Sequence, residues 1–368
     1  MFNGGAVFAP ASTVRMAYFD HNATAPVSSE VAEAVATALK TYGNPSSVHS
    51  EGRVARASVE EARERVAQLV GAKTENVIFT SGATEANNQA LRGCGRPQVL
   101  ASAIEHPSVL EVAPDDDRIP VSADGVTDLD ALSEMLKRRG RLVVVSVMAA
   151  NNESGVIQPV KTAAERAHSD GALFHCDAVQ AVGRIPFDME RLGADMATIS
   201  AHKIGGPKGV GALILAEGME VERFVHGGGQ ERSHRGGTEN VAGIAGFGVA
   251  AKQAAERRLT IGRIENLIGL LERRAQAAVP EAVVFGENVP RIANTSLIAL
   301  PGADAETQIM ALDLAGVSVS AGSACSSGKV AESHVLKAMG VDSALSRCAI
   351  RISLGFENTV EEVDKFIE

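Results

Sequence analysis

The sequence predicts an α/β protein with a largely parallel sheet and a second, smaller domain. Short apolar runs alternate with helical patterns over most of the chain, and these runs are apolar on both faces, as expected of strands covered by helices. The length of 368 residues exceeds the size at which single hydrophobic cores stop growing. After about residue 250 the pattern changes to a charged, alanine-rich helical stretch followed by short strands, which indicates the second domain.

The elements of the larger domain follow from apolar spacing. Apolar residues at i, i+4, i+7 and i+8 from Val31 predict a helix that stops at Gly43. A similar pattern from Val59 predicts a helix that ends near Gly71. The apolar runs predict strands at 77–80, 99–102, 142–148, 172–176, 196–200 and 210–215.

The smaller domain is predicted to contain a helical stretch over 250–278 and strands at 294–300 and 317–320. Thr359 and Glu362 have the spacing of a capping box at the start of a last helix. A second possible start, Met16, suggests that the residues before it lie outside the fold. We therefore expect an N-terminal extension over 1–15, a large domain over 16–255 whose first residues pack with the small domain, and a small domain over 256–368.

Composition and charge argue against several classes of protein. A net charge of −10 gives no basic face for general nucleic-acid binding. No apolar run approaches the roughly 20 residues of a membrane span, and the start has no basic region of a secretory signal. The four cysteines are scattered and the histidines lack metal-ligand spacing, so we expect a cytoplasmic protein without a disulfide framework or a metal site.

Lys203 is the most informative single residue. It follows the predicted strand 196–200 and precedes a glycine-rich turn, so small residues surround it at a strand end. Desolvation there lowers the pKa of the ammonium group, and a neutral amine can form a Schiff base with an aldehyde. A surface lysine is the ordinary alternative for this residue taken alone.

Polar groups follow several other predicted strands. The segment 80–88, which contains Thr84, opens a helix with small residues and is typical of a phosphate cradle; a plain turn capped by Ser81 is the alternative. Asp177 ends an apolar strand, where it needs a cationic partner such as a protonated pyridine nitrogen, or else caps a helix. His106 and the segment 151–155 follow two further strands. Ligands bind at strand carboxyl ends in open α/β sheets, so these groups are expected to converge on one crevice.

Cys325 lies in the sequence Ala-Gly-Ser-Ala-Cys-Ser-Ser-Gly-Lys, among residues too small to anchor a loop. Such a loop is expected to expose its thiol, and the charge of Lys329 favours the nucleophilic thiolate. A small loop residue without a role is the alternative. Cys176, within an apolar strand, has the context of a structural cysteine.

Together these motifs make the chain resemble the cysteine desulfurases of the nitrogen-fixation and iron–sulfur-cluster assembly type, within the class V aminotransferase superfamily. The resemblance runs from about Tyr18 to the C-terminus and includes the segments 44–49, 81–88, 227–232 and 235–240. It implies the type I fold of pyridoxal-phosphate-dependent transferases, pyridoxal 5'-phosphate as cofactor, a homodimer and L-cysteine as substrate. It also implies a sulfur-acceptor protein as partner.

The resemblance assigns three catalytic residues, Lys203, Cys325 and His106. Lys203 holds the cofactor as a Schiff base, Asp177 pairs with the ring nitrogen, Gln180 contacts the ring hydroxyl and His106 stacks on the ring. Asn152 and Arg351 hold the substrate carboxylate. The residues expected at the cofactor are Ala83, Thr84, His106, Asn152, Asp177, Gln180, Ser200, His202, Lys203 and Thr238, the last from the other subunit.

The implied reaction converts L-cysteine to L-alanine. The Lys203 amine removes the Cα proton, and the Cys325 thiolate takes the sulfur as a persulfide for delivery to iron–sulfur cluster assembly or tRNA thiolation. The sequence departs from the usual motifs at His21, within 232–238 and after Gly355. The alternatives are a selenocysteine lyase, a class V aminotransferase of the same fold, and a cofactor-free sulfur carrier.

Overall fold

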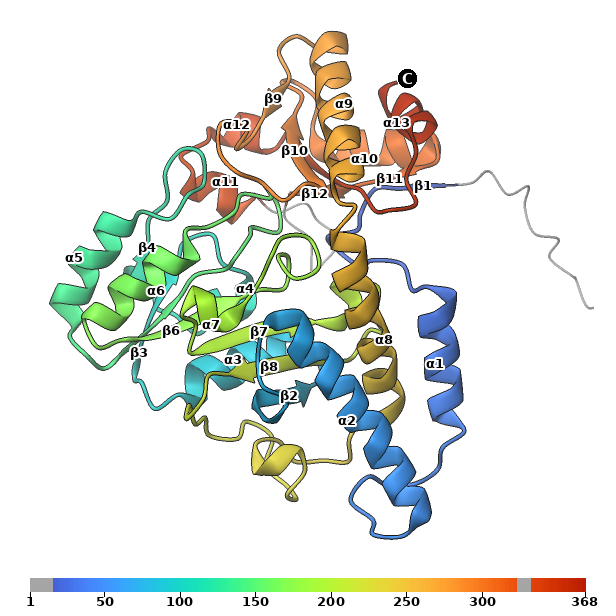
Figure 1. Cartoon of the computed structure of the whole chain (residues 1–368). Coiled ribbons are helices and arrows are strands. Elements are labelled where there is room, and N and C mark those ends of the chain that lie inside the picture. The colour runs from blue at the N-terminus through green and yellow to red at the C-terminus, as the bar shows by residue number, and fades with distance from the viewer. Residues whose placement is uncertain (1–15, 323–331) are drawn as a thin grey trace, which may run out of the picture.

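The computed structural model describes residues 16–322 and 332–368. A seven-stranded sheet, a four-stranded sheet and a two-stranded pair organise these residues, and Figure 1 shows the larger sheet with its helices below and the smaller sheet above. Cys325 lies outside the described residues, so its predicted position in a loop is not addressed by the structure. Within the described ranges, none of the helices combines the length and the apolar composition that crossing a membrane requires.

The larger sheet has seven strands in the order β2-β8-β7-β6-β5-β3-β4. β8 runs antiparallel to both of its neighbours, while the remaining strands pair in parallel. The six apolar runs therefore form strands of one largely parallel sheet, as predicted. The strands are β2 (Val77–Thr80), β3 (Gln98–Ser102), β4 (Arg118–Ile119), β5 (Val143–Ser146), β6 (Leu173–Asp177), β7 (Met196–Ser200) and β8 (Gly211–Leu215).

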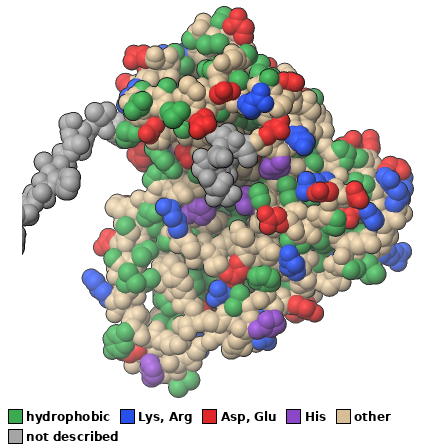
Figure 2. Space-filling view, turned by 180° about the vertical axis from the view of Figure 1, so that it is seen from behind, with side chains coloured by type: hydrophobic (Ala, Val, Ile, Leu, Met, Phe, Trp, Pro, Cys, Tyr) green, Lys and Arg blue, Asp and Glu red, His purple; other side chains and the backbone are tan. Residues whose placement is uncertain are grey.

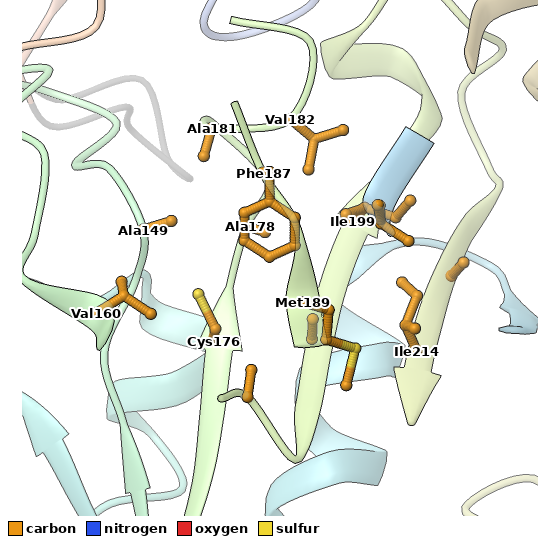
Figure 3. Close-up of a cluster of buried hydrophobic side chains, with 14 of the residues drawn as sticks. Ala149, Val160, Cys176, Ala178, Ala181, Val182, Phe187, Met189, Ile199 and Ile214 are labelled. Carbon is orange, nitrogen blue, oxygen red and sulfur yellow. The ribbon is translucent and has the colours of Figure 1, made fainter. Parts of the chain in front are cut away.

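Helices cover both faces of this sheet, which explains why its strands are apolar throughout. Val143 and Val145 of β5 face one buried cluster, and Val144 faces another. The first cluster includes α2 (Ser50–Val70), α5 (Leu129–Arg139), α6 (Val160–Ser169) and α8 (Val241–Arg258). The second includes α3 (Ala83–Gly93) and α4 (Pro107–Leu110). Figure 3 shows part of the first cluster, where Phe187 and Met189 lie near Cys176 and Ile199.

The smaller sheet is antiparallel, in the order β12-β13-β10-β9. Separately, β1 pairs in parallel with β11. This pairing brings the start of the described chain to the smaller sheet, where Phe19 is buried in the same hydrophobic cluster as residues of β10 and β13. The strands are β1 (Ala17–Tyr18), β9 (Val283–Val284), β10 (Thr295–Ala299), β11 (Val317–Ser318), β12 (Ser320–Ala321) and β13 (Ala349–Ser353). The remaining helices are α1 (Ser29–Leu39), α7 (Met189–Leu192), α9 (Gly262–Ala278), α10 (Ala305–Leu314), α11 (His334–Ala338), α12 (Ser343–Ser346) and α13 (Val360–Ile367), with four short 3-10 turns, η1 (Thr74–Asn76), η2 (Asp115–Asp117), η3 (Ala201–Lys203) and η4 (Glu231–Ser233).

Several predicted boundaries differ from the structure. α1 ends at Leu39 rather than continuing toward Gly43. The stretch 250–278 is divided between α8 and α9, and α9 begins at Gly262, a residue with low helix propensity. The single strand expected at 317–320 is two short strands, because β11 pairs with β1 and β12 pairs with β13. The end of α2 at Gly71, with φ of 65°, and the Thr359–Glu362 capping box are confirmed.

Candidate active site

A cavity of about 430 Å³ opens at the carboxyl ends of the parallel strands, where such sheets bind ligands. We call it the strand-end cavity. Figure 2 shows histidine side chains gathered between the upper and lower parts of the molecule on one face. Residues that follow five different strands meet at this cavity. Of the predicted site residues, it is lined by Ala83, Thr84, His106, Asn152, Asp177, Gln180, Ser200, His202, Lys203 and Arg351.

Lys203 lies at the end of η3, directly after β7. Its Nζ donates hydrogen bonds to the backbone carbonyls of Asn22 at 2.6 Å and Ala23 at 3.0 Å. Burial, together with the positive charges of Arg351 and Arg184, lowers the pKa of this amine from 10.5 to about 8. The lysine is therefore held in one direction by carbonyl groups while its neutral form becomes accessible near physiological pH.

Asp177, at the end of β6, is a buried carboxylate that has no cationic partner among residues 16–322 and 332–368. Its Oδ2 accepts from Asn87 Nδ2 at 2.9 Å, and its Oδ1 accepts from the N–H of Val179 at 3.0 Å. The fully buried Glu105 lies nearby, and burial, followed by the charge of Asp177, raises the pKa of Glu105 well above its usual range. The raised pKa favours the uncharged form of Glu105, so Asp177 is the carboxylate that a bound cation would meet.

His106 is the N-cap of α4, and its ring lines the strand-end cavity. Its Nδ1 accepts from the N–H of Ser108 at 3.1 Å, so the neutral ring carries its proton on Nε2. Burial lowers the pKa of His106, and the charge of Lys203 lowers it further, while Asp177 opposes the shift. A neutral ring facing the cavity suits stacking against a flat aromatic ligand.

The start of α3 supplies a place for an anion. Gly82 is the N-cap of this helix and no side chain caps its N–H groups, so the alternative of Ser81 as the cap is wrong. The N–H of Ser81 instead donates to Glu85 Oε2 at 2.9 Å. Ser200 and His202 line the same cavity, and burial lowers the pKa of His202 to about 4. First-turn N–H groups next to hydroxyl and imidazole groups are typical of a phosphate site.

Arg351 and Asn152 also line the cavity. Arg351 is buried, its Nη2 donates to Asp20 Oδ1 at 2.6 Å, and its Nη1 donates to the Asn152 carbonyl at 3.1 Å. The Nε of Arg351 and the Oδ1 of Asn152 are buried and have no hydrogen-bond partner among the described residues. Buried polar atoms without partners are uncommon, so their presence here indicates a ligand with a polar group.

Sequence reasoning missed some residues that shape this site. The carbonyls of Asn22 and Ala23 hold Lys203, Asp20 pairs with Arg351, and Asn87 and Ser108 orient Asp177 and His106. Asp20, Asn22 and Asn87 belong to motifs visible in the sequence. Their partners lie from 90 to 331 residues away, however, and no local pattern reveals such pairs.

Two further predicted residues remain, of which the structure describes one. Thr238 is exposed and follows the η4 turn, outside the cavity lining. Cys325 lies outside the described residues. In addition, the described part of the chain holds no group of three or more histidine, cysteine or acidic side chains placed to bind a metal ion.

Comparisons with known proteins give the family. A model of the class-V aminotransferase family matches residues 17–366. The cysteine desulfurase of Cereibacter sphaeroides is 41% identical over 366 residues, covering 95% of this chain and 94% of that protein.

The chain is also similar in fold and sequence to solved structures of known proteins. The NifS-like protein from Rickettsia africae is 38% identical with a TM-score of 0.89, covering 96% of this chain and 97% of that one. A structure described as SspA in complex with cysteine is 27% identical with a TM-score of 0.76, covering 92% of this chain and 98% of that one. The protein described here belongs to the class-V aminotransferase family.

Proposed function

We propose that the protein is a pyridoxal-phosphate-dependent cysteine desulfurase, which converts L-cysteine to L-alanine. The observation that carries this proposal is the 41% identity, over almost the whole chain, to a relative named cysteine desulfurase. The type I fold expected for such an enzyme is confirmed by the similarity to the NifS-like structure. The cysteine-bound structure of a more distant relative supports L-cysteine as the substrate.

The residues of the strand-end cavity fit pyridoxal 5'-phosphate. Lys203 would hold its aldehyde carbon, and Asp177, a buried carboxylate in need of a cation, would face its ring nitrogen. Thr84, Ser200 and His202 would hold its phosphate at the start of α3, with Ala83 beside them. His106 would stack on the ring, and Asn152 and Gln180 would line its edge. When bound, the cofactor supplies an electron sink for bond changes at the substrate Cα.

The chain itself supplies binding and proton transfer. Arg351 and Asn152 hold the substrate carboxylate, which accepts from Arg351 Nε and from the side-chain N–H of Asn152. The Lys203 amine, with its lowered pKa, removes the Cα proton near neutral pH. The Asn22 and Ala23 carbonyls orient that amine. The buried charge of Asp177 keeps a proton on the ring nitrogen.

The sulfur-transfer half of the reaction belongs to Cys325. Its thiolate forms a bond to the substrate sulfur while the bond from that sulfur to the substrate Cβ breaks. The electron pair of the broken bond stays with the carbon, whose Cβ takes up a proton and becomes the methyl group of alanine, and a persulfide is left on the enzyme. The loop sequence supports this role, since its residues are too small to anchor it. The persulfide then passes to an acceptor protein for iron–sulfur cluster assembly or tRNA thiolation. The enzyme works as a cytoplasmic homodimer, in which Thr238 reaches the cofactor phosphate of the other subunit.

Alanine formation tests the proposal. The cofactor-loaded protein is incubated with L-cysteine and a thiol reductant, and alanine is quantified by chromatography. Lys203→Ala and Cys325→Ser are expected to reduce alanine to background, whereas Lys252→Ala and Cys94→Ser, which alter residues outside the site, retain activity. Full activity of Cys325→Ser would contradict the persulfide role. Much faster turnover of selenocysteine than of cysteine would identify a selenocysteine lyase instead.

A further inference from the structure

A second cavity, of about 490 Å³, borders the same lysine. We call it the rear cavity. Its walls come from residues 25–30, the turn 182–184 after β6, the end of α8, the start of α9 and the turn 354–357 after β13. Among the described residues, Lys203 is the single residue that lines both the rear cavity and the strand-end cavity. The volume falls within the range of small-molecule sites in proteins.

Arg184 is a buried guanidinium in the wall of the rear cavity, with 8% of its surface exposed. Its Nη1 donates to the carbonyl and the side-chain oxygen of Gln180, and it forms no ion pair within the described ranges. Its Nε and Nη2 donate to no described residue. Burial, together with the charge of Arg351, lowers the pKa of Arg184 to about 9. A buried cation without an anion is costly, and a bound anion would remove that cost.

Arg257 adds a second positive charge to this wall. Arg257 of α8 is half-buried, and its guanidinium forms neither a hydrogen bond nor an ion pair with the residues that the structure describes. His21 is buried, and burial lowers its pKa to about 4. The charges of Arg184 and Arg257 contribute to that shift, so His21 is neutral near pH 7 and adds no charge to the wall. Both guanidinium-bearing residues line the rear cavity.

Negative groups do not neutralise these cations. Glu30 and Glu357 also line the rear cavity, but both are exposed, as expected of residues at its mouth. Glu30 Oε2 already accepts hydrogen bonds from Ser29 Oγ at 3.2 Å and Gln253 Nε2 at 3.4 Å. The inner wall therefore keeps an excess of positive charge, while the acidic groups are solvated.

The rest of the lining is apolar. Val182, Ile264 and Leu354 are buried, and Ile261 and Phe356 are half-buried. An apolar wall contributes little to binding a hydrated inorganic ion, because such an ion has no apolar surface to bury. The combination of two arginines with aliphatic and aromatic side chains favours a ligand that has one anionic group and one apolar group.

We propose that the rear cavity binds a small organic carboxylate, whose charged group bonds to Arg184 and Arg257 and whose branched or cyclic apolar part packs against Ile264 and Leu354. A carboxylate matches the planar donor arrangement of a guanidinium group. The proposal does not depend on the reaction at the strand-end cavity. It adds a second ligand site, in the rear cavity, next to the lysine that also lines the strand-end cavity.

Binding at this site acts on Lys203. The negative charge of the ligand lies near an amine whose pKa is lowered partly by the positive charge of Arg184. The ligand therefore favours the protonated amine and reduces the fraction that is neutral. The expected effect is slower chemical labelling of Lys203 in the cofactor-free protein when the carboxylate is bound.

Isothermal titration calorimetry of the cofactor-loaded protein with isovalerate tests the proposal. Isovaleramide serves as the uncharged analogue and inorganic phosphate as the anion without an apolar group. Arg257→Gln removes one proposed partner, and Arg258→Gln, the next residue on the same helix and outside the cavity lining, is its matched control. Ile261→Trp fills the cavity from a half-buried position; because Ile261 also packs against the core of the smaller sheet, the fold of this variant is checked by circular dichroism. Both tested positions border only the rear cavity, so the strand-end cavity is left intact.

The parent protein is expected to bind isovalerate saturably, and Arg258→Gln is expected to bind it with the same affinity. Arg257→Gln is expected to bind it at least tenfold more weakly, because a charged hydrogen bond is lost, and Ile261→Trp is expected not to bind it. Isovaleramide and phosphate are expected to bind at least tenfold more weakly than isovalerate. The proposal is overturned if isovalerate does not bind, or if it binds Arg257→Gln and Ile261→Trp like the parent protein, since the ligand then occupies the strand-end cavity. Equal binding of the amide or of phosphate would also overturn it. None of these outcomes bears on alanine formation, which tests the enzyme reaction separately.

Discussion

The lowered pKa of Lys203 has a direct chemical consequence. With a pKa of about 8, about 24% of the Lys203 amine is neutral at pH 7.5. With the ordinary value of 10.5, about 0.1% would be neutral at that pH. The ratio of these fractions predicts an amine about 240-fold more available for reaction at pH 7.5 than an ordinary lysine.

Competitive labelling of the cofactor-free protein with acetic anhydride measures this availability. The protein is treated at a series of pH values, and acetylation of each lysine is quantified by peptide mass spectrometry. Lys252, which is exposed on α8, monitors the reagent at each pH. Acetylation of Lys203, corrected for the reagent, is expected to reach half of its maximum near pH 8.

The opposite result would refute the reasoning. If acetylation of Lys203 continued to rise up to pH 10 or above, burial and the neighbouring arginines would not shift this pKa. The amine would then be almost entirely protonated near neutral pH, and a proton-accepting role for Lys203 would lose its physical basis. Unfolded protein, prepared in urea and labelled in parallel, supplies the unshifted comparison.

Three further predictions concern buried charges. Burial raises the pKa of Glu153 from 4.5 to about 7, so between these pH values the folded protein keeps a proton that the unfolded chain releases, and the free energy of unfolding falls as the pH rises. Glu153→Gln does not titrate, so its free energy of unfolding relative to the parent, measured in urea, should increase by about 2 to 3 kcal/mol from pH 5 to pH 8. A difference that does not change with pH would contradict this. Arg63→Met leaves the buried Glu231 carboxylate unpaired and should cost about 3 to 5 kcal/mol, whereas a loss below about 1 kcal/mol would show that the pair contributes little. Asp177→Asn should weaken retention of pyridoxal phosphate about tenfold or more, measured by absorbance after gel filtration, and unchanged retention would remove the proposed ring-nitrogen contact.

The sequence predicted the large sheet well because its strands are continuous apolar runs. In β5, for example, consecutive valines (143–145) are buried on alternate faces of the sheet. A run that is apolar at every position therefore predicts helices on both faces of the sheet. Boundaries were less predictable. The break between α8 and α9 falls in a stretch whose composition favours helix, and the split of 317–320 depends on two pairing partners distant in sequence.

The candidate site was predictable where each residue follows its own strand. Asp177, His106 and Lys203 all do so, and the parallel sheet brings the ends of their strands together. The groups that tune these residues were not predictable. Arg351 pairs with Asp20 across 331 positions, and Lys203 is held by backbone carbonyls, which no side-chain pattern can reveal. The rear cavity is a product of the same long-range packing, since its walls include turns that follow strands of both sheets.

The central claim is that the Lys203 amine attaches the cofactor. Reducing the cofactor-loaded protein with borohydride fixes any such linkage, and peptide mass spectrometry then locates it. The account predicts a pyridoxyl group on the peptide that contains Lys203 and on no other lysine of the chain. An unmodified Lys203, or a pyridoxyl group fixed to a different lysine, would contradict it.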